Sequence, residues 1–206
     1  VNIAIAKGST IVTGSEMPSF FANKLKALGG DPKKSVLVRF GASRKIGGVE
    51  ITTVPANHSN GVNPAFIHGD LGDMLKGAGL QAYVGPPTGY VLTFSNGLVV
   101  YLSGDTGVVS EQKTVVADQY GAELVVMNIG DVYTTGPKEA AYVINELIRP
   151  ISVIASHVNE VGTRGGKVVD GSKTDTFLKA VKTNAYLPLS GKVMEFDSAG
   201  ACLKGC

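Results

Sequence analysis

The sequence predicts an α/β fold, and three observations point to it. Apolar stretches of strand length alternate with stretches of helical periodicity along the whole chain. The stretches 124–127 and 151–155 show no alternation of polar and apolar residues, which is typical of strands buried on both faces. Asn96-Gly97 joins the apolar stretches 90–94 and 98–102 and predicts a hairpin, so the sheet should be mixed. We find no repeat or linker, and we expect a single domain over residues 1–206.

Capping residues set the expected helix boundaries. Ser15 is the expected N-cap of a first helix, with Pro18 in its first turn and the glycines at 29–30 ending it. Further helices are expected at 71–80, at 111–120, between Pro137 and Pro150, and at 174–182, and further strands at 10–13, 36–40, 49–54 and 193–196.

The composition excludes several classes of protein. The net charge is +2 with 17% charged residues and no tryptophan, and no basic run is longer than two residues, as at Lys33-Lys34, so we expect no nucleic-acid partner. No apolar stretch approaches the roughly 18 residues of a membrane span, so we expect no membrane partner. Cys202 and Cys206 are too few for a zinc site of their own and form either a disulfide or free thiols. The localisation is unknown, although a disulfide would favour an exported or periplasmic protein.

Three polar residues follow apolar strands at their ends and carry the candidate chemistry. His58 follows the strand at 49–54, Asp105 follows the strand at 98–102, and His157 follows the strand at 151–155. Layered α/β folds build their sites at such strand ends. Taken singly, each residue is also a plausible turn or loop residue, but two imidazoles and a carboxylate together suit zinc, iron or manganese. His68 follows no strand and is interpreted as a surface residue.

Four stretches in order resemble the metallo-β-lactamase superfamily, and specifically its ascorbate-6-phosphate-lactonase-like branch. They are ITTVPANHSN at 51–60, GYVLTFSNGLVVYLSGDTG at 89–107, LVVMNIGDVYTTGPKEAA at 124–141 and ISVIASHVNE at 151–160. The resemblance covers the chain from about Ala4 to Phe196. It implies an αβ/βα sandwich with mixed sheets.

The same resemblance implies a site for two metal ions. His58 would bind one metal, Asp105 would bridge both, and His157 would bind the other, with zinc as the expected metal and iron or manganese as alternatives. Asn128, Asp131 and Tyr133 are expected beside the site as supporting groups. The implied activity is metal-dependent hydrolysis, in which hydroxide attacks an ester, lactone, amide or phosphoester of a small-molecule substrate.

The chain departs from the family at its beginning. The family signature His-x-His-x-Asp-His precedes the region that matches Val1, and no histidine here precedes His58. We therefore expect an N-terminally incomplete fold, the C-terminal two-thirds or more, present as a fragment of a hydrolase. The alternatives are a non-catalytic remnant that acts as a binding or self-assembling module, and a structural α/β protein of unrelated function. An incomplete sheet exposes an edge, so we expect a homo-oligomer or pairing with the missing N-terminal segment.

The stretch 57–87 is rich in turn-forming residues and is the expected location of substrate selection, with 61–79 as a lid. Its large apolar side chains are interpreted as packing residues, with the lining of an apolar pocket as the alternative: Phe66, Leu71, Met74 and Leu75.

Overall fold

The computed structural model describes residues 1–14 and 16–206, which form two compact units. Unit 1 comprises residues 1–40 and 59–86, and unit 2 comprises residues 41–58 and 87–206. The expectation of a single domain over residues 1–206 stays a prediction. None of the helices in the described residues is long and apolar enough to cross a membrane.

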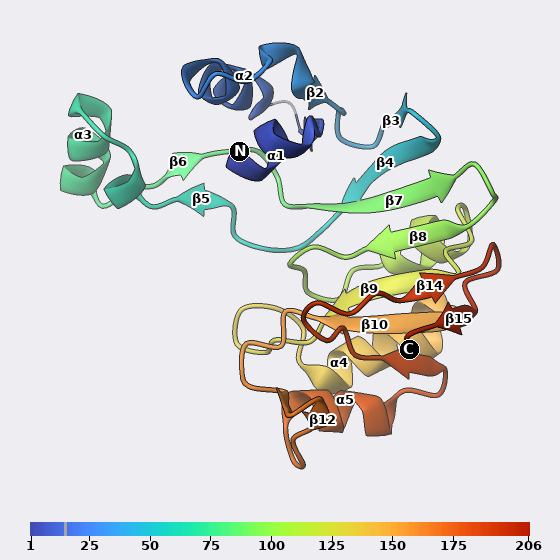
Figure 1. The fold of residues 1–206 in the computed structure, drawn as a ribbon. Coiled ribbons are helices and arrows are strands. Elements are labelled where there is room, and N and C mark those ends of the chain that lie inside the picture. The colour runs from blue at the N-terminus through green and yellow to red at the C-terminus, as the bar shows by residue number, and fades with distance from the viewer. Residues whose placement is uncertain (15) are drawn as a thin grey trace. The chain divides into compact units, whose positions relative to one another are not determined.

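Unit 2 is built on one seven-stranded mixed sheet (Figure 1). Neighbouring strands are parallel from β13 through β10 and β9 to β8, and antiparallel from β8 through β7 and β4 to β3. This arrangement confirms the predicted mixed sheet and α/β class. In spatial order the strands are β13 (Asn184–Tyr186), β10 (Ser152–Ser156), β9 (Leu124–Asn128), β8 (Val99–Leu102), β7 (Thr88–Phe94), β4 (Val49–Pro55) and β3 (Ser43–Ile46).

The strand directions bring four carboxyl ends to one edge of this sheet. Strands β4 and β8 both run antiparallel to β7, so β4 points the same way as β8. Strands β9 and β10 continue in that direction because each step from β8 is parallel. The loops that follow β4, β8, β9 and β10 therefore leave the sheet at the same edge, where α/β folds place their sites.

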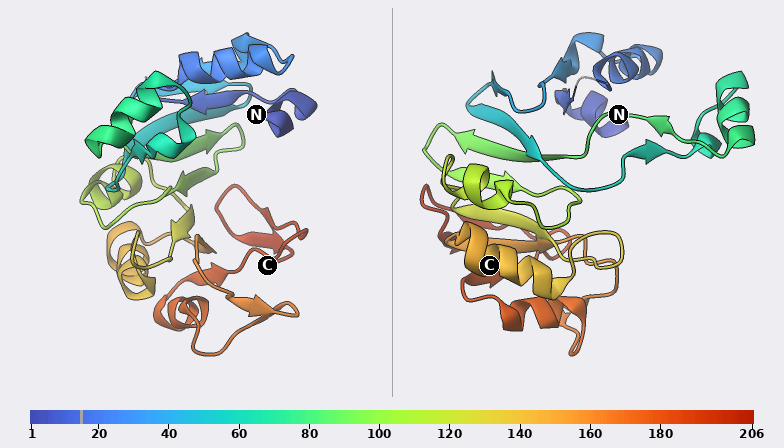
Figure 2. Two further views of the ribbon diagram at one scale, coloured as in Figure 1. Left: turned by 90° about the vertical axis from the view of Figure 1, so that its left-hand side faces the viewer. Right: turned by 180° about the vertical axis from the view of Figure 1, so that it is seen from behind.

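One face of the sheet packs against helices (Figure 2). Tyr101, Val125 and Val153 lie in register on three adjacent strands and are fully buried in this layer. The expected helix at 111–120 is a shorter π-helix, and the helix that begins at Pro137 continues as a π-helix. The covering elements are η3 (Gln112–Ala117), α4 (Pro137–Tyr142), η4 (Val143–Ile148) and α5 (Lys173–Ala180).

The opposite face carries a smaller apolar cluster. Leu98, Val100 and Leu124 are buried there, and Phe196 packs against them from β14 (Glu195–Phe196). Strand β14 pairs with β15 (Cys202–Lys204), and a disulfide joins Cys202 to Cys206. Burial on both faces explains why the central strands lack polar alternation.

Unit 1 contains a parallel two-stranded sheet of β1 (Ile11–Thr13) and β2 (Ser35–Leu37), so the expected strand at 36–40 ends early. Helix α2 (Pro18–Ala27) begins at its proline with Met17 as N-cap, and the expected cap Ser15 lies outside the described residues. The unit also contains α1 (Asn2–Lys7), η1 (Pro32–Lys34), β5 (Gly61–Val62), η2 (Pro64–Phe66), α3 (Asp70–Ala78) and β6 (Ala82–Tyr83).

Helix α3 confirms the helix expected at 71–80, but its apolar side chains are not packing residues. Phe66, Leu71 and Met74 are 79%, 53% and 63% exposed, so their interpretation as packing residues is wrong. The reason is that α3 contacts η2 through glycine: a Cβ at Gly72 would lie 1.8 Å from the carbonyl oxygen of Ile67. The helix backbone fills this contact and leaves the large side chains outside it. Leu75 is half-buried.

Truncating the core of unit 2 should destabilise it strongly. Phe177 of α5 is fully buried in the helix-covered cluster, so Phe177→Ala should lower the free energy of unfolding by about 3–5 kcal/mol. Phe66→Ala is the matched control, because its ring is exposed, and should change it by less than about 0.5 kcal/mol. Urea unfolding of both variants measures the difference, and equal losses would contradict this description of the core.

Candidate metal centre

Asp105 and His157 meet at the carboxyl edge of the sheet. Asp105 lies in the loop after β8, and His157 directly follows β10. His157 Nε2 lies 3.3 Å from Asp105 Oδ2, and the two side chains are 38% and 44% exposed. A partly exposed imidazole and carboxylate that face each other are accessible to an ion from solvent.

His58 belongs to the same edge of the sheet through its neighbour Asn57. The backbone N–H of Asn57 donates to Thr106 Oγ1 at 2.9 Å, and Gly107 N–H donates to the Asn57 carbonyl at 2.9 Å. The loop after β4 is therefore bound to the loop that carries Asp105. His58 itself is half-buried.

The backbone of His157 is held in an unusual conformation. Its φ is 46°, in the left-handed region that residues with a Cβ seldom adopt. Gly130 lies against it, since a Cβ there would lie 2.5 Å from the His157 carbonyl oxygen and 2.7 Å from Nδ1. The Gly130 carbonyl accepts a hydrogen bond from Lys173 Nζ at 2.5 Å. Glycine at 130 is thus needed for the imidazole to occupy its place.

Asn128 joins the loops after β8 and β9 from a fully buried position at the end of β9. Its Nδ2 donates to the Thr106 carbonyl at 3.0 Å and to Thr135 Oγ1 at 2.7 Å. Ser103 Oγ donates to Asn128 Oδ1 at 2.9 Å, and Thr135 Oγ1 donates to the Asn128 carbonyl at 2.9 Å. Every polar atom of the amide is used, so the network fixes the backbone beside Asp105.

The side chains of Asp131 and Tyr133 do not take part in this network, although the Asp131 N–H donates to the Thr135 carbonyl at 3.2 Å. Both are exposed, and Asp131 Oδ1 accepts a hydrogen bond from the Val132 N–H at 2.8 Å. Asp131 and Val132 have φ angles of 61° and 62°, in the left-handed region. This conformation is strained for Val132, because its side chain is β-branched. The structure therefore places Asn128 against the loop that carries Asp105, and Asp131 and Tyr133 on an exposed turn.

The donor pair fits part of a metal site. Two ligands about 2.0–2.2 Å from a tetrahedral zinc stand about 3.4 Å apart, close to the 3.3 Å between His157 Nε2 and Asp105 Oδ2. A catalytic zinc has three protein ligands. Within residues 1–14 and 16–206, no group of three or more His, Cys, Asp or Glu side chains is arranged to hold a metal ion. On its own the pair therefore has fewer ligands than a catalytic zinc requires.

Several residues of the site were not singled out from the sequence. Thr106, Thr135 and Ser103 hold Asn128, and Gly130 makes room for His157. Thr106 and Ser103 lie within two residues of Asp105 in the sequence, and this proximity is the feature that could have identified them. Thr135 and Gly130 follow β9 at the same sheet edge, which only the strand order makes visible.

Comparison with known proteins identifies sequence relatives that are longer than this chain. No protein-family model matches the chain. A UPF0173 metal-dependent hydrolase of Roseiflexus castenholzii is 32% identical over 157 residues, which is 76% of this chain and 57% of the relative. Another from a Polaromonas species is 34% identical over 113 residues, 53% of this chain and 37% of the relative. The chain thus spans about half the length of such relatives, and by sequence it resembles metal-dependent hydrolase enzymes.

Solved structures show the fold. Igni18, a metallo hydrolase from Ignicoccus hospitalis, matches 91% of this chain and 68% of its own with a TM-score of 0.63 at 21% identity. The metallo-β-lactamase-fold protein YhfI from Bacillus subtilis matches 88% of this chain and 64% of its own with a TM-score of 0.52 at 10% identity. The chain therefore has a metallo-β-lactamase-like α/β fold, as the sequence predicted.

Removing the Asn128 amide should loosen the site. Asn128→Ala removes one hydrogen bond each from the Thr106 carbonyl, the Ser103 hydroxyl and the Thr135 hydroxyl, although each of these groups keeps another partner. Each lost hydrogen bond costs about 1 kcal/mol. We expect a loss of about 2–4 kcal/mol in the free energy of unfolding, because part of the loss is relieved by water. Asn184→Ala is the control, since Asn184 is exposed, and should cost less than about 1 kcal/mol. Similar losses in the two variants would show that the network does not hold the loops.

Proposed function

We propose that this chain carries the His58, Asp105 and His157 part of the site of a di-metal hydrolase. The 3.3 Å pairing of His157 Nε2 with Asp105 Oδ2 at the carboxyl edge of the sheet carries the proposal. Asp105 would be the ligand shared by the two metals, since a carboxylate between two cations would reduce their repulsion. His157 serves one metal and His58 the other, with zinc preferred over iron or manganese because imidazole and carboxylate suit it.

When bound, the metals supply Lewis-acid chemistry and lower the pKa of a water, which suits hydrolysis of an ester, lactone, amide or phosphoester. The chain's own residues hold the ligands in place. Gly130 lets the His157 ring lie at the edge, and the Asn128 network fixes the loop of Asp105. This preorganisation reduces the rearrangement that substrate binding requires.

The remaining ligands are proposed to come from a segment that the longer relatives contain and this chain does not span. The 57% coverage of the Roseiflexus relative supports this, as does the pair's shortfall from three protein ligands. We also propose the ascorbate-6-phosphate-lactonase-like branch for the chain, on its four matching stretches. The substrate is a small molecule.

A non-catalytic binding or self-assembling module is the second candidate, and one observation favours it. Unit 1 exposes a group of large apolar side chains within 18 residues of sequence, which is typical of a surface that another chain covers. The group comprises Phe66 at 79%, Leu71 at 53%, Met74 at 63%, Leu80 at 60% and Tyr83 at 70% exposure. This candidate predicts a stable oligomer without stoichiometric metal.

We also propose an oxidising compartment, such as the periplasm, for this protein. The Cys202–Cys206 disulfide supports this proposal.

Metal binding separates the two candidates. We expect the full-length form to bind about two zinc ions per chain. Elemental analysis after gel filtration measures this, with the intact mass and the oligomeric size taken from the same sample. Asp105→Ala and His157→Ala should each weaken binding at least about tenfold, because each removes a direct ligand. His68→Ala is the matched control, since His68 is exposed and lies outside the pair. An oligomer with no metal would favour the module.

Turnover tests the enzyme directly. In the full-length form, His58→Ala, Asp105→Ala and His157→Ala should each abolish hydrolysis by the metal-loaded protein, whereas His68→Ala should retain it. Chromogenic esters and lactones provide the assay. Wild-type rates in all three variants would refute the assigned site.

A further inference from the structure

A cavity of about 240 Å³ opens beside His157, at the carboxyl ends of two parallel strands. His157 follows β10, and Leu187 and Pro188 follow β13, which pairs with β10. The cavity therefore lies at the same sheet edge as the Asp105–His157 pair. Its lining residues are Ala155, Ser156, His157, Val158, Glu160, Gly162, Thr163, Thr174, Leu187 and Pro188.

Thr174, the second residue of α5, gives this cavity a specific polar group. The residue is fully buried, and its Oγ1 has no hydrogen-bond partner among the described residues. A buried hydroxyl without a partner costs free energy, so such a group indicates that something outside the chain satisfies it. Because Thr174 lines the cavity, a molecule in the cavity can be that partner.

Gly162 lies directly against this hydroxyl. A Cβ at residue 162 would lie 2.3 Å from Thr174 Oγ1 and 3.5 Å from Val158 Cγ1. Any other residue would therefore occupy the space in front of the hydroxyl. The absence of a side chain at 162 keeps the Thr174 hydroxyl within reach of the cavity.

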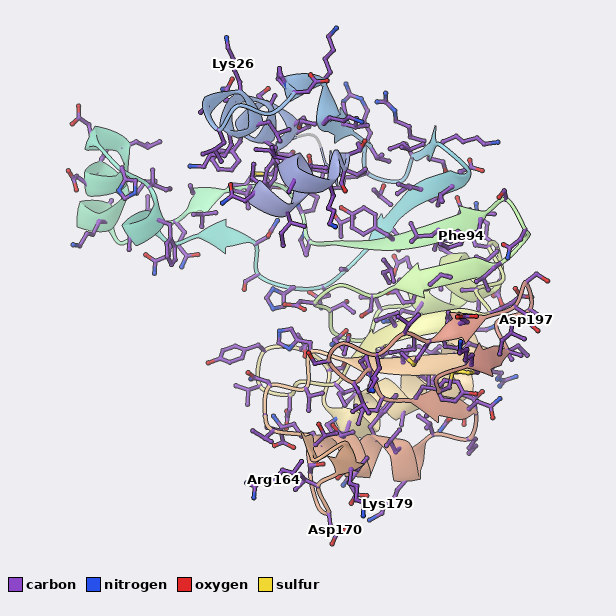
Figure 3. The ribbon with its side chains drawn as sticks, in the orientation of Figure 1. Lys26, Phe94, Arg164, Asp170, Lys179 and Asp197 are labelled. Carbon is purple, nitrogen blue, oxygen red and sulfur yellow. A yellow bond between two sulfur atoms is a disulfide. The ribbon has the colours of Figure 1, made fainter. Side chains whose placement is uncertain are left out.

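The charges around the cavity disfavour an anionic occupant. Glu160 contributes a carboxylate to the lining, and its Oε1 accepts from the backbone N–H of Lys173 at 2.5 Å. The Lys173 ammonium is directed to the Gly130 carbonyl. Lys179, further along α5, pairs with Asp170 on the outer side of the helix (Figure 3). No lysine or arginine is among the described residues that line the cavity.

We propose that this cavity is the substrate pocket of the site and takes an uncharged, oxygen-bearing group, which the Thr174 hydroxyl binds by donating a hydrogen bond. Val158, Leu187 and Pro188 contact the apolar part of that group. The substrate class is a neutral ester, lactone or amide with an ether oxygen in its acyl part. The assignment as a substrate pocket rests on the proposed function, because the pocket adjoins His157.

Binding of two matched fragments to the metal-free chain tests the pocket without any turnover. Methoxyacetamide and butyramide have the same length, and only the first carries an ether oxygen. In a ¹H–¹⁵N NMR titration, both should shift the amides of Val158, Gly162 and Thr163, and methoxyacetamide should bind about 2- to 13-fold more tightly. Metal is absent from the experiment, so its result is independent of whether the metal site is correct.

Substitutions at Thr174 test whether its hydroxyl causes the preference for methoxyacetamide over butyramide. Thr174→Val keeps the shape and should abolish the preference, and Thr174→Ser should retain it. Thr176→Val makes the same change in α5 outside the lining and should leave the preference intact. Methoxyacetate should bind more weakly than methoxyacetamide, because the Glu160 carboxylate repels its charge. Glu160→Gln should therefore reduce the difference in affinity between the two ligands. Equal affinity of the two amides for the wild type, shifts that map elsewhere, or tighter binding of methoxyacetate would each overturn the proposal.

Discussion

The hydrogen bonds of the buried Asn128 amide are the constraint on which the candidate site depends. The residue ends β9, the central parallel strand, and its Nδ2 reaches the carbonyl of Thr106, the residue after Asp105. Thr106 in turn accepts from the backbone of Asn57, beside His58. One amide therefore links the loops after β8 and β9 directly and the loop after β4 through one threonine. Apolar packing alone would hold the strands but would leave these loops free to move.

The sheet beneath this network determines which loops are available to it. A hairpin between β7 and β8 reverses the chain, and a second antiparallel step restores the direction of β4 to that of β8. Without this double reversal, His58 would lie at the opposite edge from Asp105. The core supports the arrangement from both sides, with helices on one face and the apolar cluster around Leu124 on the other.

Much of the fold and the pair at its centre was predictable from local patterns. Strand-length apolar stretches located the sheet, and Asp105 and His157 were found from their position after such strands. The exposed side chains of α3 were not predictable, because amphipathic spacing shows that an apolar face exists but does not show what covers it. The contact of Gly130 with His157 was equally hidden, since residues 27 positions apart meet only through the pairing of β9 with β10.

The strand order also affects how the protein acquires its metal ligands during folding. Asp105 and His157 are 52 positions apart, and their approach requires the parallel pairing of β8 with β9 and of β9 with β10. Such non-local pairings raise contact order and form slowly, because the closure of the intervening loops opposes them. An ion that needs both side chains gains its full affinity only after this part of the sheet is complete. Metal uptake would then report the end of folding, and a bound ion would stabilise the folded chain by mass action.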